Sequence, residues 1–197
     1  AESPKWIGRC PVCGEWNTYV EEVVSTKSAA GGRGEFGTME QSKVRPQRID
    51  DIQITEESRI DLGNGELNRV LGGGLVRGSL VLIGGEPGIG KSTLILQTVL
   101  ALKGQKILYV SGEESARQLK LRAERIGGNA PDCYIVCETS LEDIFVHIRN
   151  VDPDIVVIDS IQTIATSAME SSPGSVGQVR ECAASLLKFA KQTNTPV

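Results

Sequence analysis

The residues most clearly arranged for chemistry form a glycine-rich segment, GEPGIGKS, at positions 85–92. The segment matches G-x-x-x-x-G-K-[ST] in full, follows an apolar run and opens a helical pattern. Its glycines let the backbone curl so that successive N–H groups point at one phosphate, and the helix N-terminus adds partial positive charge. We expect the Lys91 ammonium to reach the β- and γ-phosphates of ATP, and the Ser92 hydroxyl to ligate Mg²⁺. The predicted nucleotide-binding residues are Gly85, Glu86, Pro87, Gly88, Ile89, Gly90, Lys91, Ser92 and Thr93. The alternative, a glycine turn with an incidental Lys-Ser pair, does not explain a full match in this context.

Two carboxylates are predicted to complete the catalytic set with Lys91. The run IVVID at 155–159 predicts a buried strand that ends at Asp159 beside the phosphate loop, where the acid would hold Mg²⁺ directly or through a water. A buried strand that merely ends in Asp is the alternative. Glu113 follows another apolar strand, KILYVSG, and we predict that it orients or activates the attacking water. Its alternative role is to stabilise the dipole of the next helix.

From residue 66 on, apolar runs alternate with helical patterns. The runs that predict buried strands cover residues 79–85, 106–112, 133–138 and 154–161. Helical spacing covers residues 91–104, 115–127, 140–151 and 178–193, after a short helix in ELNRVLGGG that the glycines end. Because strands and helices alternate, the predicted fold class is α/β, a mainly parallel sheet with helices on both faces. We place this core at residues 48–197, and residues 48–62 could add an edge strand.

The first 47 residues differ from the rest of the chain in composition and in the pattern of apolar residues. Residues 1–24 form a compact segment that contains CPVC, and residues 25–47 have the composition of a flexible linker. Cys10 and Cys13 have the C-x₂-C spacing of zinc ligands, but structural zinc takes four ligands. We therefore expect zinc at this cysteine pair only in a longer, intact protein. Redox use is the alternative, and it lacks a thioredoxin-like strand context.

Composition and charge limit the class of protein. The chain has 197 residues, 40% hydrophobic and 23% charged, as in ordinary globular domains. A formal net charge of −4 argues against a protein that coats nucleic acid by bulk charge, although it is compatible with a local basic patch. We find no apolar run long enough for a membrane span and no signal peptide. Five cysteines, an odd count, favour a reducing cytoplasm over a disulfide scaffold.

Several motifs together resemble the RadA (Sms) family of bacterial DNA repair proteins. They are LNRVLGGGLVRGSLVLIGGEPGIGKSTLILQ, YVSGEES, QLKLRAERIG, VVIDSIQT and PGSVGQVRECAASLLKFAK, in the family's order. The resemblance implies a RecA-like P-loop ATPase core, with GEPGIGKS as the Walker A motif and VVIDS, which contains Asp159, as Walker B. It matches Glu113 of YVSGEES to the catalytic glutamate of RecA. It also matches WIGRCPVCGEW to the second half of a four-cysteine zinc finger.

The resemblance also implies a function. Such proteins are DNA-dependent ATPase motors of recombinational repair that form homo-hexameric rings, load on single-stranded DNA and drive branch migration, similar in outline to DnaB helicases. They use ATP and Mg²⁺, carry Zn²⁺, and act on single-stranded and branched DNA with the RecA recombinase as a partner. By the same resemblance, Gln162 could sense the γ-phosphate, and the loop at 166–177 falls where RecA-like proteins contact DNA. Arg180, which flanks that loop, is our predicted contact to a DNA phosphate.

Three departures from the family pattern bear on activity. The first cysteine pair of the zinc finger is absent, the KNRFG segment would lie beyond Val197, and the Lon-protease-like C-terminal domain is missing. We therefore interpret the chain as a fragment that binds nucleotide but hydrolyses it weakly, because family rings complete each site with a neighbour's basic residues. Two other functions stay open. One is a KaiC-like nucleotide-switched ATPase or kinase, which the cysteine pair disfavours, and the other is an inert nucleotide-binding module.

Overall fold

A computed structural model of the chain describes residues 48–51, 59–127 and 132–197. The chain divides into two compact units, Ala1–Asp51 and Ile52–Val197. The described part of the first unit contains a 3₁₀ turn, η1 (Ile49–Asp51). The expected zinc segment with Cys10 and Cys13, and the expected linker at 25–47, lie outside the described residues.

A three-stranded parallel sheet forms the centre of the second unit. Its strands are β1 (Ile107–Ser111), β2 (Cys133–Cys137) and β3 (Ile155–Asp159), in the order β2-β1-β3. β1 is buried along its whole length because it has a neighbour on each side. Ser111 is in register with Asp159, so β1 and β3 end at the same level. The predictions of these three strands and of a parallel sheet are confirmed.

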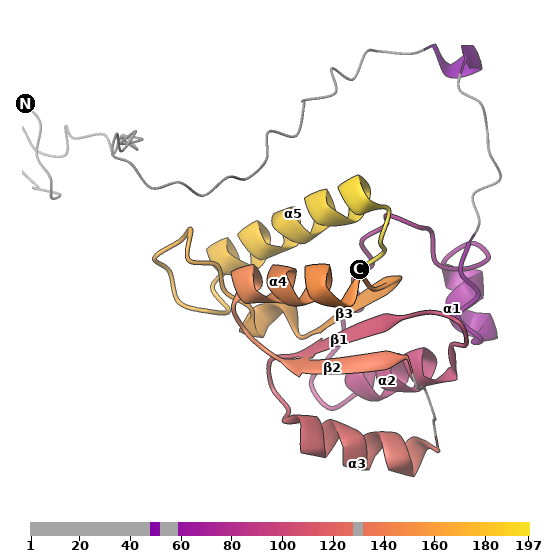
Figure 1. Cartoon of the computed structure of the whole chain (residues 1–197), viewed down its shortest axis with the longest axis horizontal. Coiled ribbons are helices and arrows are strands. Elements are labelled where there is room, and N and C mark those ends of the chain that lie inside the picture. The colour runs from indigo at the N-terminus through magenta and orange to yellow at the C-terminus, as the bar shows by residue number, and fades with distance from the viewer. Residues whose placement is uncertain (1–47, 52–58, 128–131) are drawn as a thin grey trace, which may run out of the picture. The chain divides into compact units, whose positions relative to one another are not determined.

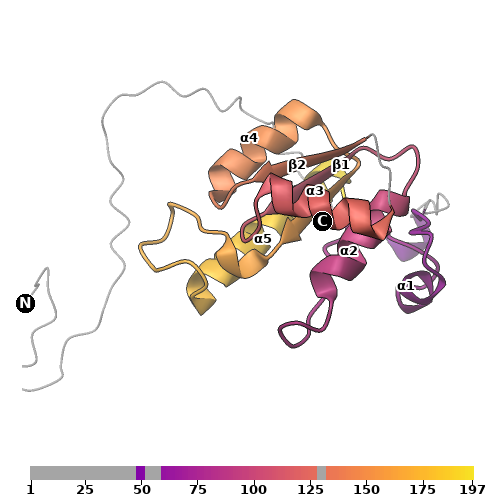
Figure 2. The same cartoon turned by 90° about the horizontal axis from the view of Figure 1, so that it is seen from below.

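Helices cover both faces of this sheet, with α4 and α5 on one face and α2 and α3 on the other (Figure 1). The bounds of the helices are α1 (Gly65–Val70), α2 (Lys91–Ala101), α3 (Ala116–Ile126), α4 (Leu141–Val151), the 3₁₀ turn η2 (Ile161–Thr163) and α5 (Val176–Thr193). Figure 2 shows α2 and α3 side by side on their face of the sheet. Local signals set these limits: Ser140 caps α4 by accepting a hydrogen bond from Asp143 N–H, and Gly127 ends α3 in left-handed backbone.

Two apolar clusters fill the space on either side of the sheet. On the α2–α3 face, Leu96 and Leu119 pack with alternate residues of the strands, among them Tyr109. On the α4–α5 face, Ile144 and Leu186 pack with the intervening strand residues. The alternation follows from the pleat, which points successive side chains to opposite faces. Tyr109 pairs with Val157, and Asp159 is two residues further along β3. The side chains of Tyr109 and Asp159 therefore point to the same face of the sheet, the α2–α3 face.

Residues 79–85 do not form the buried strand that their apolar pattern predicts. Two backbone hydrogen bonds pair this segment with Val197 in the parallel manner, from Val81 N to Val197 O (2.9 Å) and from Val197 N to Ser79 O (3.0 Å). Pro196 O in turn accepts from Val156 N of β3 (3.0 Å). Residues 196 and 197 thus lie between the 79–85 segment and β3, and they are the whole length of chain with which this segment pairs among the described residues. In the part of the chain that the structure describes nothing covers Leu82, which is 81% exposed.

Candidate active site

The loop predicted to cradle phosphate lies between the 79–84 segment and the first turn of α2. Gly88 and Gly90 have φ angles of 78° and 103°, in the left-handed region that side-chain-bearing residues rarely adopt. Gly90 is also the N-cap of α2, and no side chain among the described residues caps that helix. The N–H groups of the first turn of α2 are therefore available to an anion, and the loop residues 85–90 are exposed.

The Lys91 side chain bends back onto the backbone at the start of this loop. Its Nζ donates hydrogen bonds to Gly85 O and to Glu86 O, both at 2.9 Å. The ammonium therefore sits beside the backbone that would surround a phosphate, and it is held there only by carbonyl oxygens at an exposed position. A phosphate group carries full negative charge and makes stronger hydrogen bonds to an ammonium than neutral carbonyls do.

Ser92 and Asp159 meet although 67 positions separate them in the sequence. Ser92 Oγ donates a hydrogen bond to Asp159 Oδ1 at 3.0 Å, which joins the first turn of α2 to the carboxyl end of β3. A hydroxyl and a carboxylate are hard oxygen donors of the kind that Mg²⁺ prefers, and Mg²⁺ usually takes one or two carboxylates with water and phosphate oxygens. The two side chains therefore fit an Mg²⁺ site. No cluster of three or more His, Cys, Asp or Glu that could hold a metal ion occurs in the described ranges.

Tyr109 is a member of this site that sequence reasoning missed. Its ring is fully buried in β1, and its hydroxyl donates a hydrogen bond to Asp159 Oδ2 at 2.6 Å. Burial first, and then the hydrogen bond and negative charge of Asp159, raise the pKa of the phenol far above its usual value of 10.0. Both oxygens of Asp159 are therefore engaged, one by Ser92 and one by Tyr109. A tyrosine in an apolar run usually indicates only core packing.

Glu113 lies just beyond the end of β1, at the same edge of the sheet as Asp159. Ser160 Oγ donates a hydrogen bond to Glu113 Oε1 at 2.7 Å, and Gly112 N donates to Asp159 O at 2.9 Å. These bonds tie the loop after β1 to the residues that follow β3. Glu113 is exposed, whereas the neighbouring Glu114 forms an ion pair with Arg122 of α3 at 2.7 Å. Of the two acids, Glu113 is the one left accessible at the site.

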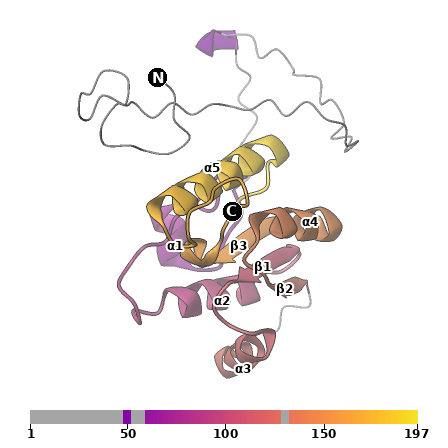
Figure 3. The ribbon, with the colours of Figure 1, turned by 90° about the vertical axis from the view of Figure 1, so that its left-hand side faces the viewer.

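The residues predicted for nucleotide sensing and DNA contact lie after β3. Gln162 is exposed on η2, the turn that follows Ser160, and Arg180 is exposed near the start of α5. The loop between η2 and α5 extends past the carboxyl end of the sheet, the edge that faces the viewer in Figure 3. Gln162 is therefore close in sequence to Asp159, whereas Arg180 lies on α5.

One buried side chain, that of Gln178, holds the first residues of the loop between η2 and α5 by hydrogen bonds. Gln178, which is 1% exposed, accepts a hydrogen bond from Thr166 N and donates from Nε2 to Thr166 O, Met169 O and Ser171 O, at 2.9–3.2 Å. Glu142 of α4 also accepts from Thr166 Oγ1 at 2.8 Å. Desolvation raises the pKa of Glu142, but hydrogen bonds from Thr166 and Ser167 outweigh it and lower the pKa to about 2. The loop is therefore anchored at its start.

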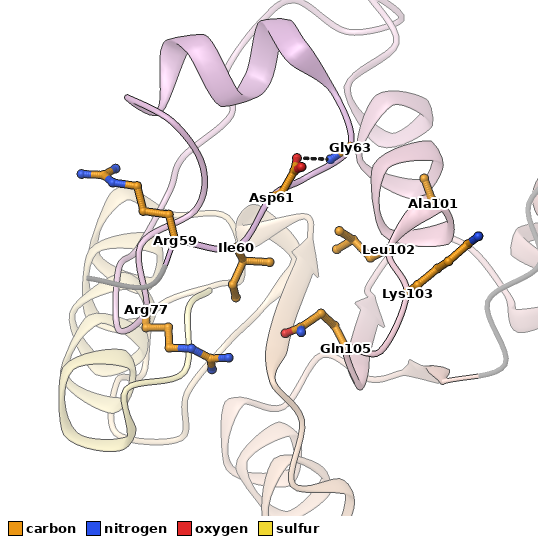
Figure 4. Close-up of a pocket in the computed structure, with 9 residues that line it drawn as sticks. All are labelled: Arg59, Ile60, Asp61, Gly63, Arg77, Ala101, Leu102, Lys103 and Gln105. Carbon is orange, nitrogen blue, oxygen red and sulfur yellow. Dashed lines mark hydrogen bonds between the residues drawn. The ribbon is translucent and has the colours of Figure 1, made fainter. Parts of the chain in front are cut away.

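A separate cavity of about 430 Å³ lies at the other end of α2 (Figure 4). Its lining consists of Arg59, Ile60, Asp61, Gly63, Arg77, Ala101, Leu102, Lys103 and Gln105. Ala101 is ten residues from Lys91, which corresponds to about 15 Å along a helix axis. The Arg59 guanidinium points away from the cavity and donates to Leu71 O at 2.8 Å. This cavity is therefore distinct from the phosphate loop.

A family model described as AAA domain matches residues 43–197. The chain belongs to this AAA domain family. The match covers the phosphate loop, Asp159 and all of the described sheet, and it agrees with the α/β core and the P-loop ATPase class predicted from the sequence. A second model, described as rubredoxin metal binding domain, matches residues 1–21, which contain Cys10 and Cys13.

Curated relatives extend this family assignment. The chain is 52% identical over its whole length to DNA repair protein RadA of Bacillus subtilis (strain 168), 50% to that of Listeria monocytogenes, and 46% to that of Pseudomonas aeruginosa. It spans 42–43% of the length of these relatives. The resemblance to the RadA family that the motifs indicated is confirmed. Among the described residues no helix is long and apolar enough to cross a membrane.

Proposed function

We propose that this chain carries the nucleotide-binding and catalytic core of a DNA-dependent ATPase of recombinational repair. The observation that carries the proposal is the hydrogen bond between Ser92 and Asp159, which joins the glycine-loop motif to the acid at the end of β3. The Ser92 hydroxyl and the Lys91 ammonium of the first motif, with the Asp159 carboxylate of the second, support a nucleotide site at this loop. The AAA domain match and the RadA relatives support the same class of activity.

Each of these residues has a proposed role in ATP hydrolysis. Lys91 would leave the carbonyls of Gly85 and Glu86 and bind β- and γ-phosphate oxygens, while the N–H groups of the loop surround the phosphates. Ser92 and Asp159 would hold Mg²⁺. Bound there, Mg²⁺ would supply positive charge that offsets the negative charge developing on the phosphates during transfer.

Glu113 would orient the attacking water. Its carboxylate lies at the carboxyl edge of the sheet and is held by Ser160 Oγ, so its position is defined before nucleotide arrives. Water attacks the γ-phosphorus, the bond to the β-phosphate oxygen breaks, and ADP and inorganic phosphate leave. Gln162, which follows Ser160 on η2, would sense whether the γ-phosphate is present. A move of η2 would reach Glu113 through the Ser160 hydrogen bond.

For the intact protein, we propose that it binds single-stranded and branched DNA, with the loop at 166–177 and Arg180 as contacts. It would assemble as a homo-hexamer and drive helicase-like branch migration. It would act in the cytoplasm together with the RecA recombinase. Zn²⁺ at Cys10 and Cys13 would complete a ribbon with a second cysteine pair. This isolated chain should bind nucleotide but turn it over slowly, because a neighbouring subunit completes each site.

The test is ATP turnover by the full-length protein with and without single-stranded DNA, with Lys91→Ala as the inactive control. We expect DNA to raise phosphate release several-fold in the wild type and Lys91→Ala to abolish it. Turnover that DNA leaves unchanged would contradict the DNA-dependent motor. Stable transfer of the γ-phosphate to a Ser or Thr of the protein would instead favour the KaiC-like kinase.

A further inference from the structure

The buried tyrosine of β1 has a contact that packing alone does not require. Tyr109 sits in the central strand, with its ring in the cluster formed with α2 and α3, and its hydroxyl reaches Asp159 Oδ2 at 2.6 Å. The register makes this possible, because Tyr109 pairs with Val157 and the phenol extends along the sheet to the acid two residues on. A short hydrogen bond to a carboxylate is of the stronger, charge-assisted kind.

The chemistry of the two groups fixes the direction of this hydrogen bond. An ionised carboxylate has no proton to give, so the buried Tyr109 hydroxyl is the donor and Asp159 Oδ2 the acceptor. The Asp159 oxygens consequently differ. Oδ2 is held from inside the sheet by a donor that cannot leave, whereas Oδ1 faces Ser92 at the start of α2.

We propose that Tyr109 is a positioning residue that makes Asp159 a single-oxygen ligand, with Oδ1 directed at the cation beside Ser92. This inference rests on the proposed nucleotide site. Without the phenol, the carboxylate could turn about its Cβ–Cγ bond and present either oxygen. Groups of this kind, which hold a metal-binding carboxylate without touching the metal, typically change metal affinity or activity 10- to 100-fold when they are removed.

The experiment compares Tyr109→Phe with wild type in the binding of a fluorescent ADP analogue at a series of Mg²⁺ concentrations. The variant keeps the ring and removes only the hydroxyl. We expect the Mg²⁺ concentration for half-maximal effect to rise about 10-fold or more, while analogue affinity in EDTA stays as in the wild type. Tyr134→Phe is the matched control, because Tyr134 lies on β2 and is 47% exposed. It should leave both quantities unchanged.

A double-mutant cycle separates positioning from general stability. If Tyr109 acts through Asp159, the shift caused by Tyr109→Phe disappears in an Asp159→Asn background, because the target of the phenol is already altered. A Tyr109→Phe protein that binds the analogue in EDTA with an unchanged Mg²⁺ requirement would overturn the positioning role and leave the nucleotide site standing. Wild-type protein that binds no analogue at all would overturn the proposed function and this inference together. If Tyr109→Phe fails to fold, a structure of the wild-type protein with ADP and Mn²⁺ decides, and a cation held by Asp159 Oδ2 would overturn the role.

Discussion

Replacing Gly112 by alanine should separate two loops that the active site needs in contact. A Cβ built on Gly112 overlaps Thr163 Oγ1 and lies 2.6 Å from Thr163 Cβ, against the 3.0 Å that real Cβ atoms keep. A change of the Thr163 rotamer could remove the first overlap but not the second. The loop after β1 and the turn η2 must therefore move apart by at least the difference, 3.0 − 2.6 = 0.4 Å. Overpacking of this kind costs about 1–3 kcal/mol.

The assay is urea unfolding of Gly112→Ala together with ATP turnover. We expect the free energy of unfolding to fall by about 1–3 kcal/mol. We also expect turnover to fall more than nucleotide affinity, because Gly112 N bonds to Asp159 O and Glu113 bonds to Ser160 across the same junction. Gly65→Ala is the control, since a Cβ there meets nothing within 4 Å. It should match the wild type or gain up to about 1 kcal/mol from helix propensity.

A second substitution tests the cause of the loss. Thr163→Gly removes both atoms that the new Cβ would meet, although it also removes the hydrogen bond from Thr163 Oγ1 to Ser160 O (2.7 Å). Combined with Gly112→Ala, it should restore part of the lost stability, with a favourable coupling energy of about 0.5–3 kcal/mol. A Gly112→Ala protein as stable as the Gly65→Ala control would refute the reasoning about this close approach.

The remaining predictions concern groups outside this junction. Gln178→Met should lower stability by about 1–3 kcal/mol through unpaired backbone groups and should speed proteolytic cleavage within 166–175, whereas Gln97→Met, at an exposed position of α2, should do neither. Wild-type cleavage rates in Gln178→Met would contradict the anchoring role. Because the pKa of Glu142 is lowered from 4.5 to about 2, its contribution to the free energy of unfolding is complete above pH 4.5 and is lost as the pH falls towards 2. Unfolding free energies measured over that range should fall less steeply in Glu142→Gln, and equal slopes would disprove the linkage. Because the pKa of Tyr109 is raised above 10.0, the unfolded state alone loses that proton above pH 10, so stability should fall there by up to about 1.4 kcal/mol per pH unit. The free energy of unfolding of Tyr109→Phe should lack this decrease above pH 10. The same pH dependence in Tyr109→Phe and wild type would contradict the raised pKa of the buried phenol.

The elements that the sequence predicted are those with local signals. The strands at 106–112 and 154–161 are apolar runs of strand length, and the helix at 140–151 begins at a serine cap. The phosphate loop could be found because its glycines, lysine and serine are contiguous. The meeting of Ser92 with Asp159 could be inferred, since parallel strands present their carboxyl ends at one edge.

The features that the sequence did not reveal depend on register and on distant partners. The pattern S-x-x-Q occurs before α3 at Ser115–Gln118 and before α5 at Ser175–Gln178. Only the first forms a capping box, while Gln178 turns into the protein and bonds to the preceding loop. Tyr109 was likewise indistinguishable from a core residue until the β1–β3 register placed it beside Asp159. The 79–85 segment failed as a strand because strand formation needs a partner, which local pattern does not supply.

A structure of the chain with ADP and Mg²⁺ tests the central claim most directly. The account predicts that Lys91 Nζ leaves Gly85 O and Glu86 O for a phosphate oxygen, and that Ser92 Oγ turns from Asp159 Oδ1 towards the cation. Nucleotide bound instead in the cavity at the far end of α2, with Lys91 still on its two carbonyls, would contradict the account.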